Sequence, residues 1–119
     1  MSDSEDRPQL EQGYTRIANA LFKGILEYPF RGGELRLVLA VIRLTYGWGR
    51  KEAVLKIREL ALVSGLSHRH AKRLIKHLVR DRVLLRQPIN RVKVVIGLNK
   101  EFSTWLHRPK RAARNVPTI

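Results

Sequence analysis

The sequence predicts an α+β domain in which four helices and one short strand come before a β-hairpin. Between residues 15 and 81, apolar residues recur every three or four positions, which is typical of helices packed against a core. From residue 83 the apolar residues instead alternate with polar ones, which is typical of half-buried strands. A length of 119 residues suits a single domain of this kind.

The first two helices are expected on either side of Pro29, which stops the first helix near Tyr28. Thr15 is a suitable N-cap for that helix. Its apolar face would be formed by Ile17, Ala18, Leu21, Phe22 and Ile25. The second helix would end at Gly47 and bury a stripe made of Leu35, Val38, Leu39, Ile42 and Tyr46. The stretch GWGRK is then a turn with two cations, and EAVLKI is a short strand.

The next two helices are joined by a tight turn. IRELALVSG predicts a short third helix that ends at Gly65 and packs through Leu60, Ala61 and either Val63 or Ser64. A small residue at position 61 lets the two helices approach closely, and Gly65 supplies the positive φ that the turn needs. Ser67 would cap the fourth helix, which runs to about Asp81. This helix would dock through Ala71, Leu74, Ile75 and Leu78.

The hairpin is predicted from the strands VLLRQ and VKVVIGL, separated by PINR, whose Pro88 and Asn90 suit a turn. One face of the second strand would hold Val92, Val94, Ile96 and Leu98, with Arg91 and Lys93 on the other. We expect Phe102 to pack back on the domain, and we expect Trp48 and Trp105 to pack in the core or a loop and not to stack on bases. This order of elements is that of a winged helix-turn-helix.

Positive charge is concentrated in the predicted domain. The chain has 24 Lys and Arg against 10 Asp and Glu, a formal net charge of +14. Four of the acids lie in the first eleven residues, so the remainder carries 23 bases and 6 acids, or +17. Such a charge favours a polyanion, with nucleic acid as the leading candidate and an anionic membrane as the alternative. We divide the chain into a disordered acidic arm (1–12), the winged-helix domain (13–106) and a basic tail or linker (107–119).

The fourth helix carries the strongest functional signal. Its apolar residues lie within about 60° of Ala71 around the helix axis, and four cations lie within about 40° of the opposite side. Solvated faces usually mix acids and bases, because like charges three or four residues apart repel. We interpret it as a recognition helix, with base contacts in the major groove from Ser67, His68, Arg69, Lys72 and Arg73. Contacts to phosphates or through the hairpin are expected from Arg50, Lys51, Lys56, Arg58, Lys76, Arg80, Arg86, Arg91 and Lys93.

Other classes of function have little support in the sequence. The absence of cysteine excludes disulfides, thiolate catalysis and zinc-finger sites. His70 and His77 lie two helical turns apart, about 10 Å, so one metal cannot join them. There is no glycine-rich phosphate loop and no nucleophile beside a base, so we expect no catalytic residues, no metal and no cofactor. No apolar run of about 18 residues and no signal peptide are present, so we expect a cytoplasmic protein without a membrane partner.

Four stretches of the chain resemble the N-terminal domain of bacteriophage replication protein O, the lambda-type initiator family. They are GYTRIANAL (13–21), LAVIRLTYGWGRK (39–51), LALVSGLSHRHAKRLIKHL (60–78) and IGLNKEFSTW (96–105). The resemblance covers about residues 12–106. Its more specific parts are the opening helix and the Tyr-Gly-Trp turn, since the helix-turn-helix is shared with many regulators.

The resemblance implies an initiator that binds repeated sites at a phage replication origin, usually as dimers, and that brings in helicase-loading machinery through a separate C-terminal region. This sequence stops soon after the domain, so we expect either a truncated DNA-binding domain or a relative without the loader-binding part. Residues 67–76 fall on the family's recognition helix. We expect double-stranded DNA as the partner and a homodimer on DNA, with a monomer left open for the free domain. A winged-helix transcriptional regulator stays an alternative, as does, less favoured, an RNA- or protein-binding winged helix.

Overall fold

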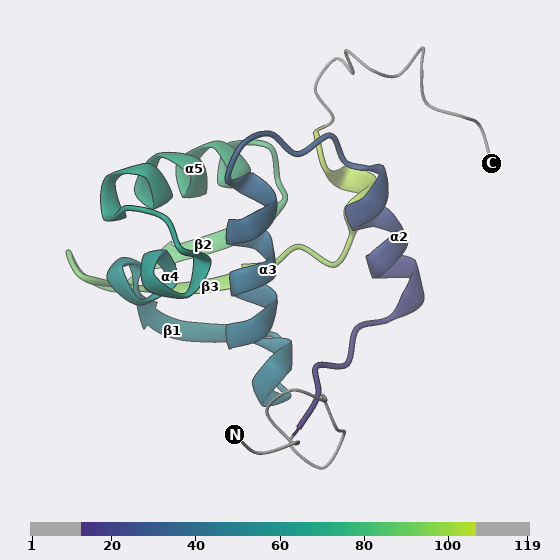
Figure 1. The fold of residues 1–119 in the computed structure, drawn as a ribbon, viewed down its shortest axis with the longest axis horizontal. Helices are drawn as coiled ribbons and strands as arrows, with labels where there is room; N and C mark the ends of the chain where they lie inside the picture. The colour runs from purple at the N-terminus through teal and green to yellow at the C-terminus, as the bar shows by residue number, and fades with distance from the viewer. Residues whose placement is uncertain (1–12, 107–119) are drawn as a thin grey trace, which may run out of the picture.

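The computed structural model describes residues 13–106 as four α-helices and a three-stranded antiparallel sheet (Figure 1). In chain order the elements are α2 (Asn19–Glu27), α3 (Glu34–Leu44), the 3₁₀ turn η2 (Tyr46–Trp48), β1 (Glu52–Lys56), α4 (Ile57–Ser64), α5 (His68–Arg80), β2 (Leu84–Pro88), β3 (Lys93–Leu98) and the 3₁₀ turn η3 (Phe102–Thr104). This order confirms the predicted α+β fold class and is compatible with a winged helix-turn-helix. The predicted acidic arm and basic tail lie outside the described residues.

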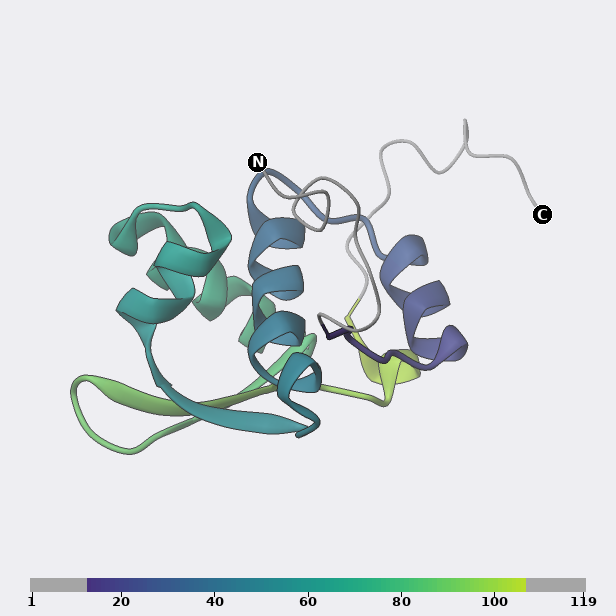
Figure 2. The same cartoon turned by 60° about the horizontal axis from the view of Figure 1, so that its bottom comes forward.

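The sheet has the strand order β1-β3-β2, so β3, the last strand in the sequence, lies in the middle. Alternation of side chains puts Leu55 and its partner Val94 on the buried face, together with Ala53 and its partner Ile96. The helices lie on that face, and the loop between β2 and β3 extends beyond them (Figure 2). The hairpin is therefore both anchored through its base and exposed at its tip.

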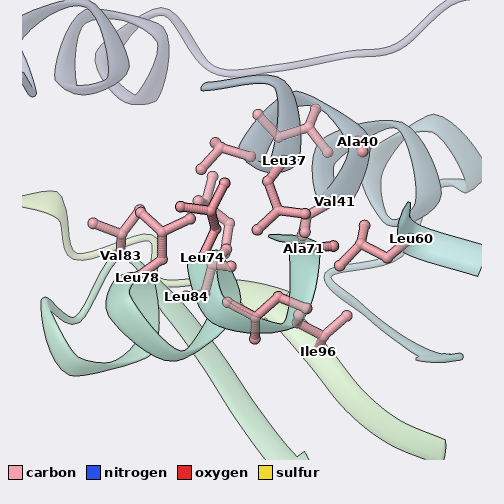
Figure 3. Close-up of a cluster of buried hydrophobic side chains, with 14 of the residues drawn as sticks. Leu37, Ala40, Val41, Leu60, Ala71, Leu74, Leu78, Val83, Leu84 and Ile96 are labelled. Atoms are coloured by element: carbon pink, nitrogen blue, oxygen red, sulfur yellow. The ribbon is translucent and has the colours of Figure 1, made fainter. Parts of the chain in front are cut away.

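The core forms where α3, α4 and α5 meet the sheet. Leu37 and Val41 of α3 point toward α5, and Leu60 of α4 and Ile96 of β3 close the cluster (Figure 3). The residues of α5 in this cluster are Ala71, Leu74, Ile75 and Leu78, as predicted. Because the buried residues of α5 pack against the core along its whole length, the orientation of its exposed face is also set.

The turn between α4 and α5 has the predicted chemistry. Gly65 follows α4 with φ +74°, and its N–H bonds to the carbonyls of Ala61 and Leu62. Ala61 and Ser64 are buried whereas Val63 is exposed, which settles the choice left open by the sequence. Ser67 caps α5, because its Oγ accepts a hydrogen bond of 3.1 Å from the His70 N–H.

Several details of the sequence interpretation are wrong, among them the position of Pro88, which ends β2 and does not lie in the turn. The first helix begins at Asn19 after an extended Ala18, so Thr15 does not cap it. Helix α3 ends at Leu44 and not at Gly47, and the positive φ that follows belongs to Gly49. Val92 precedes β3 and is exposed. The side chains predicted in the core but found exposed by 40–52% are Phe22, Leu35 and Leu39.

The last error has a physical reason. Helix α3 has apolar residues on more than one side, so a period of 3.6 residues fits more than one stripe. Packing selects the stripe of Leu37, Val38 and Val41, which faces α5 and the sheet. Sequence periodicity alone could not distinguish between these stripes.

The closing segment packs back on the domain as predicted, and it does so against α2. Trp105 is buried, its ring edge meets Tyr28 at 5.6 Å between centroids, and its Nε1 donates to the Asn99 carbonyl at 2.9 Å. A Cβ at Gly24 would lie 2.8 Å from Phe102, so glycine permits this close approach. Within residues 13–106, every helix is too short or too polar to cross a membrane.

Candidate nucleic-acid interface

Helix α5 separates apolar from cationic side chains almost completely. Its buried face docks on the core, and its exposed face carries His68, Arg69, Lys72, Arg73, Lys76 and Arg80. The structure thus places five of the predicted base or phosphate contacts of this helix on one solvent-facing surface, and His68, at the first position of the helix, is exposed as well. The remaining predicted base-contact residue, Ser67, uses its Oγ as the helix cap, which leaves its hydroxyl proton available to a partner.

Within the described part of the chain, the cations of α5 have almost no neutralising partner. Among residues 13–106, no acidic side chain lies within ion-pair distance of Arg69, Lys72, Arg73 or Lys76. Arg80 is the exception, because its Nε lies 3.3 Å from Oδ1 of Asp81. Like charges at i, i+3 and i, i+4 repel each other. The exposed face of α5 therefore carries positive charge that the described residues do not neutralise, at a cost to helix stability.

A groove of about 430 Å³ runs along one side of α5, next to the N-terminal end of α3. Its cationic lining comes from Arg31 in the α2–α3 loop and from Arg73 and Arg80 of α5, with His70 and His77 between them. Glu34 also lines the groove, but it is buried and its Oε1 accepts a hydrogen bond of 2.8 Å from the Arg31 N–H. The basic surface of α5 therefore continues onto the loop between α2 and α3.

The tip of the hairpin adds a second basic surface. Its turn is ordered by Asn90, whose Oδ1 accepts hydrogen bonds of 2.8 Å from the N–H groups of Val92 and Lys93. The register pairs Lys56 with Lys93, so two ammonium groups share the outer face of the sheet, where like charges are destabilising. Arg86, opposite Ile96, and Arg91 in the turn are also exposed.

The structure does not bring all the predicted phosphate contacts together. Lys56 ends β1 and Arg58 lies in the first turn of α4, so both are near the hairpin tip. Arg50 and Lys51 come before β1, at the other end of that strand, where Glu52 pairs with Gly97. Five strand residues span about 17 Å. Arg50 and Lys51 are therefore separated from the hairpin tip, although only a few residues divide them from Lys56.

Three groups that position this interface were not identified from the sequence. Asp81 is buried at the end of α5 and accepts a hydrogen bond of 2.9 Å from the Tyr28 hydroxyl, which joins α2 to α5. Arg36 of α3 lies over the turn, with Nη2 3.6 Å from where a Cβ on Gly65 would be. Tyr28 and Asp81 are 53 residues apart. No local pattern in the sequence marks contacts of this kind.

Comparison with known proteins places this arrangement in a family. The family described as bacteriophage replication protein O matches residues 7–105. The chain belongs to the bacteriophage replication protein O family. It is 31% identical over 108 residues to replication protein 15 of Enterobacteria phage phi80, and 30% identical over 97 residues to DNA replication protein gp18 of Salmonella phage P22.

The extent of these similarities matters for what they imply. They cover 91% and 82% of this chain but only 35% and 34% of the two relatives, so the chain spans about a third of the length of these curated replication proteins. No solved structure matches the chain. Membership of a phage replication family confirms the resemblance proposed from the four sequence stretches, and the role of each residue within the family stays a prediction.

Proposed function

We propose that residues 13–106 bind double-stranded DNA sequence-specifically at repeated sites of a phage replication origin and so take part in initiating replication. The observation that carries this proposal is the exposed face of α5, where Arg69, Lys72, Arg73 and Lys76 have no acidic partner among the described residues. An α-helix fits the major groove of B-DNA, and this helix follows a helix-turn-helix turn. Membership of the phage replication family supports the origin as the target.

The proposal divides the cations by position. Arg69, Lys72 and Arg73 lie in the N-terminal half of α5 with His68, where side chains of a recognition helix reach base edges. Lys76 and Arg80, farther along, would meet phosphates, and Arg86, Arg91 and Lys93 would let the hairpin lie on the backbone or minor groove. Lys56 and Arg58 would contact the same backbone from the start of α4.

We further propose that two copies of the domain bind each site. One small module buries limited surface and contacts few base pairs, whereas a symmetric pair doubles the site and matches a palindrome. Repulsion between basic faces would keep the free domain monomeric until DNA neutralises both. Recruitment of helicase-loading machinery would belong to other parts of such a protein, in the cytoplasm of the host.

Binding, and not catalysis, is the proposed activity. Among residues 13–106, no three His, Asp or Glu side chains are grouped to hold a metal ion. The basic residues of α5 instead supply what phosphate and base recognition requires. Purified protein should therefore show no DNA-stimulated ATP hydrolysis, and activity that follows the wild-type chain through successive columns would contradict this.

The decisive experiment is DNase footprinting of the chain across its parent phage genome. We expect protection of repeated sites, each with two-fold character, at the replication origin. Protection of a single promoter operator, with no repeated sites, would support the transcriptional-regulator alternative. In parallel, the binding constant for one such site should fall with salt, with a slope of about −0.9 in log K against log salt for each phosphate contacted. A slope near zero would exclude this mode of binding.

A further inference from the structure

Trp48 is exposed by 67%, although the sequence analysis placed it in packing. It does not lie in a loose loop. The turn η2 is closed by hydrogen bonds from the Trp48 N–H to the Thr45 carbonyl (3.0 Å) and from the Gly49 N–H to the Tyr46 carbonyl (2.9 Å). Thr45 is fully buried, and its Oγ1 donates to the Val41 carbonyl at 2.7 Å. An aromatic ring is therefore held in solvent by an ordered backbone.

Tyr46, two residues earlier, points the other way. Its hydroxyl is buried and has no hydrogen-bond partner among the described residues, and burial raises the pKa of this phenol. Tyr46 thus anchors the turn in the protein, whereas the side chain of Trp48 is exposed to solvent. Because Trp48 is mostly exposed, it buries little apolar surface, so stabilisation of the core does not explain why a tryptophan occupies this position.

Trp48 lines a cavity of about 340 Å³, together with Tyr14, Thr15 and Arg43. Tyr14 is exposed by 60%, so two aromatic rings and a guanidinium border the same open space. The position of a Cβ on Gly47 would be 2.9 Å from Nη1 of Arg43 and 3.3 Å from Oγ1 of Thr15. Glycine at this position therefore lets Arg43 lie close to the turn.

Further cations lie in the segments next to the turn that borders this cavity. Arg50 and Lys51 follow the turn directly, and Lys100 comes from the end of β3, beside Lys51. The Lys51 carbonyl lies 2.8 Å from where a Cβ on Gly97 would be, so Lys51 is beside β3, and interaction with Lys51 lowers the pKa of Lys100. The acids of the same segments are Glu52 and Glu101, so the cations stay in excess.

We propose that Trp48, with Tyr14 and Arg43, forms a second nucleic-acid site that binds a single strand by stacking an unpaired base. Exposed aromatic rings on a fixed backbone bind any base through its face, and neighbouring cations follow the phosphates. A duplex would not expose such a face, because its bases are stacked on each other. This site goes beyond the proposed duplex binding and does not depend on it.

The position of the site separates it from the proposed duplex interface. It lies where β1 begins, at the Glu52–Gly97 end of the sheet, whereas the hairpin tip lies at the Lys56–Lys93 end, about 13 Å away along the strand. Helix α3 runs from the groove beside α5, at Glu34, to the turn that carries Trp48 (Figure 1). A single strand could therefore be held while α5 occupies a major groove.

Fluorescence anisotropy of the full chain with labelled oligothymidylate and oligouridylate, each about 12 nucleotides long, tests the proposal. Trp48→Ala should weaken binding of the preferred strand by about 5- to 150-fold, the range for loss of one base–aromatic stack. Trp48→Phe keeps an aromatic face and should retain most of the affinity. Phe22→Ala removes another exposed aromatic ring, outside the cavity, and should leave binding unchanged. The more tightly bound strand identifies the natural ligand as DNA or RNA.

A crossed measurement separates this site from the duplex interface. Trp48→Ala should leave affinity for duplex DNA unchanged, and Arg69→Ala should weaken duplex binding while it leaves single-strand binding nearly unchanged. Tryptophan emission should also be quenched by the strand in the wild-type chain but not in Trp48→Phe, since Trp105 is buried. Wild-type affinity of Trp48→Ala for both strands would overturn the proposal. So would equal losses of single-strand affinity in Trp48→Ala and Arg69→Ala.

Discussion

Helices α2 and α5 are both amphipathic, but they differ in how their charges are balanced. The two charges of α2 form an i, i+4 pair, with Nζ of Lys23 3.8 Å from Oε1 of Glu27. Helix α5 has cations at the same spacing and no acid among them. Among the described residues, the two charges of α2 balance each other, whereas four cations of α5 have no acidic partner. Amphipathicity locates the core side of both helices, and charge balance distinguishes their exposed faces.

The two helices are nevertheless connected. The Tyr28 hydroxyl, just after α2, bonds to the carboxylate of Asp81, just after α5. Trp105 packs against Tyr28, and the Leu106 N–H donates to the Asp81 carbonyl at 2.8 Å. The neutral helix and the closing segment therefore hold the C-terminal end of the cationic helix in place.

The largest expected difference concerns how firmly each helix is packed. Leu78 of α5 is fully buried, so Leu78→Ala should lower the free energy of unfolding by about 2–5 kcal/mol, from lost apolar contact and the cavity left behind. Ile25 of α2 lies nearer the surface, and Ile25→Ala should cost less. Urea denaturation of both variants measures this. An equal or larger loss for Ile25→Ala would show that α2 contributes as much to the core as α5.

The connection between the helices should come next. Tyr28→Phe removes a buried hydrogen bond to a carboxylate and should cost about 1.5–3 kcal/mol of stability. Tyr46→Phe is the matched control, because its buried hydroxyl has no partner among the described residues; this change should be neutral or stabilising. Thermal or urea unfolding of the two variants compares them directly. Equal losses would mean that the Tyr28–Asp81 bond is not what ties α2 to α5.

The charge difference between the helices should appear in binding. Arg69→Ala and Arg73→Ala in α5 should each weaken binding to the specific duplex by about 1–3 kcal/mol and reduce the preference for it over other sequences. Lys23→Ala in α2 removes the same charge from the chain and should change affinity little. Gel-shift titration with specific and scrambled duplexes tests all three. If the α5 variants lose affinity equally for both duplexes, these residues contact phosphates and not bases.

The smallest expected effects concern the helix caps. Ser67→Ala removes the side-chain cap of α5 and should cost about 0.5–2 kcal/mol. Helix α2 has extended Ala18 at its N-cap and no side-chain cap, so Ala18→Ser should stabilise the protein by up to about 1 kcal/mol. Denaturation midpoints measure both changes. A loss of stability in Ala18→Ser would indicate that the backbone at this position cannot place a hydroxyl over the first turn.

The sequence by itself determined the parts of this protein that depend on local chemistry. Gly65 and Ser67 fixed the turn and the start of α5, because a positive φ and an N-cap are properties of single residues. The periods of apolar residues fixed the order of helices and strands. The cationic face of α5 was also predictable, since helical geometry alone places residues 69, 73, 76 and 80 opposite Ala71.

The tertiary structure decided what depends on contacts between distant segments. It selected the buried stripe of α3, where more than one stripe was apolar, and it exposed Trp48 while it buried Trp105. It also placed Lys51 and Lys56 at opposite ends of β1 and brought Lys51 against Gly97 of β3. Local patterns describe which faces a segment has, but the faces that are buried and the charges that meet depend on packing between segments far apart in the chain.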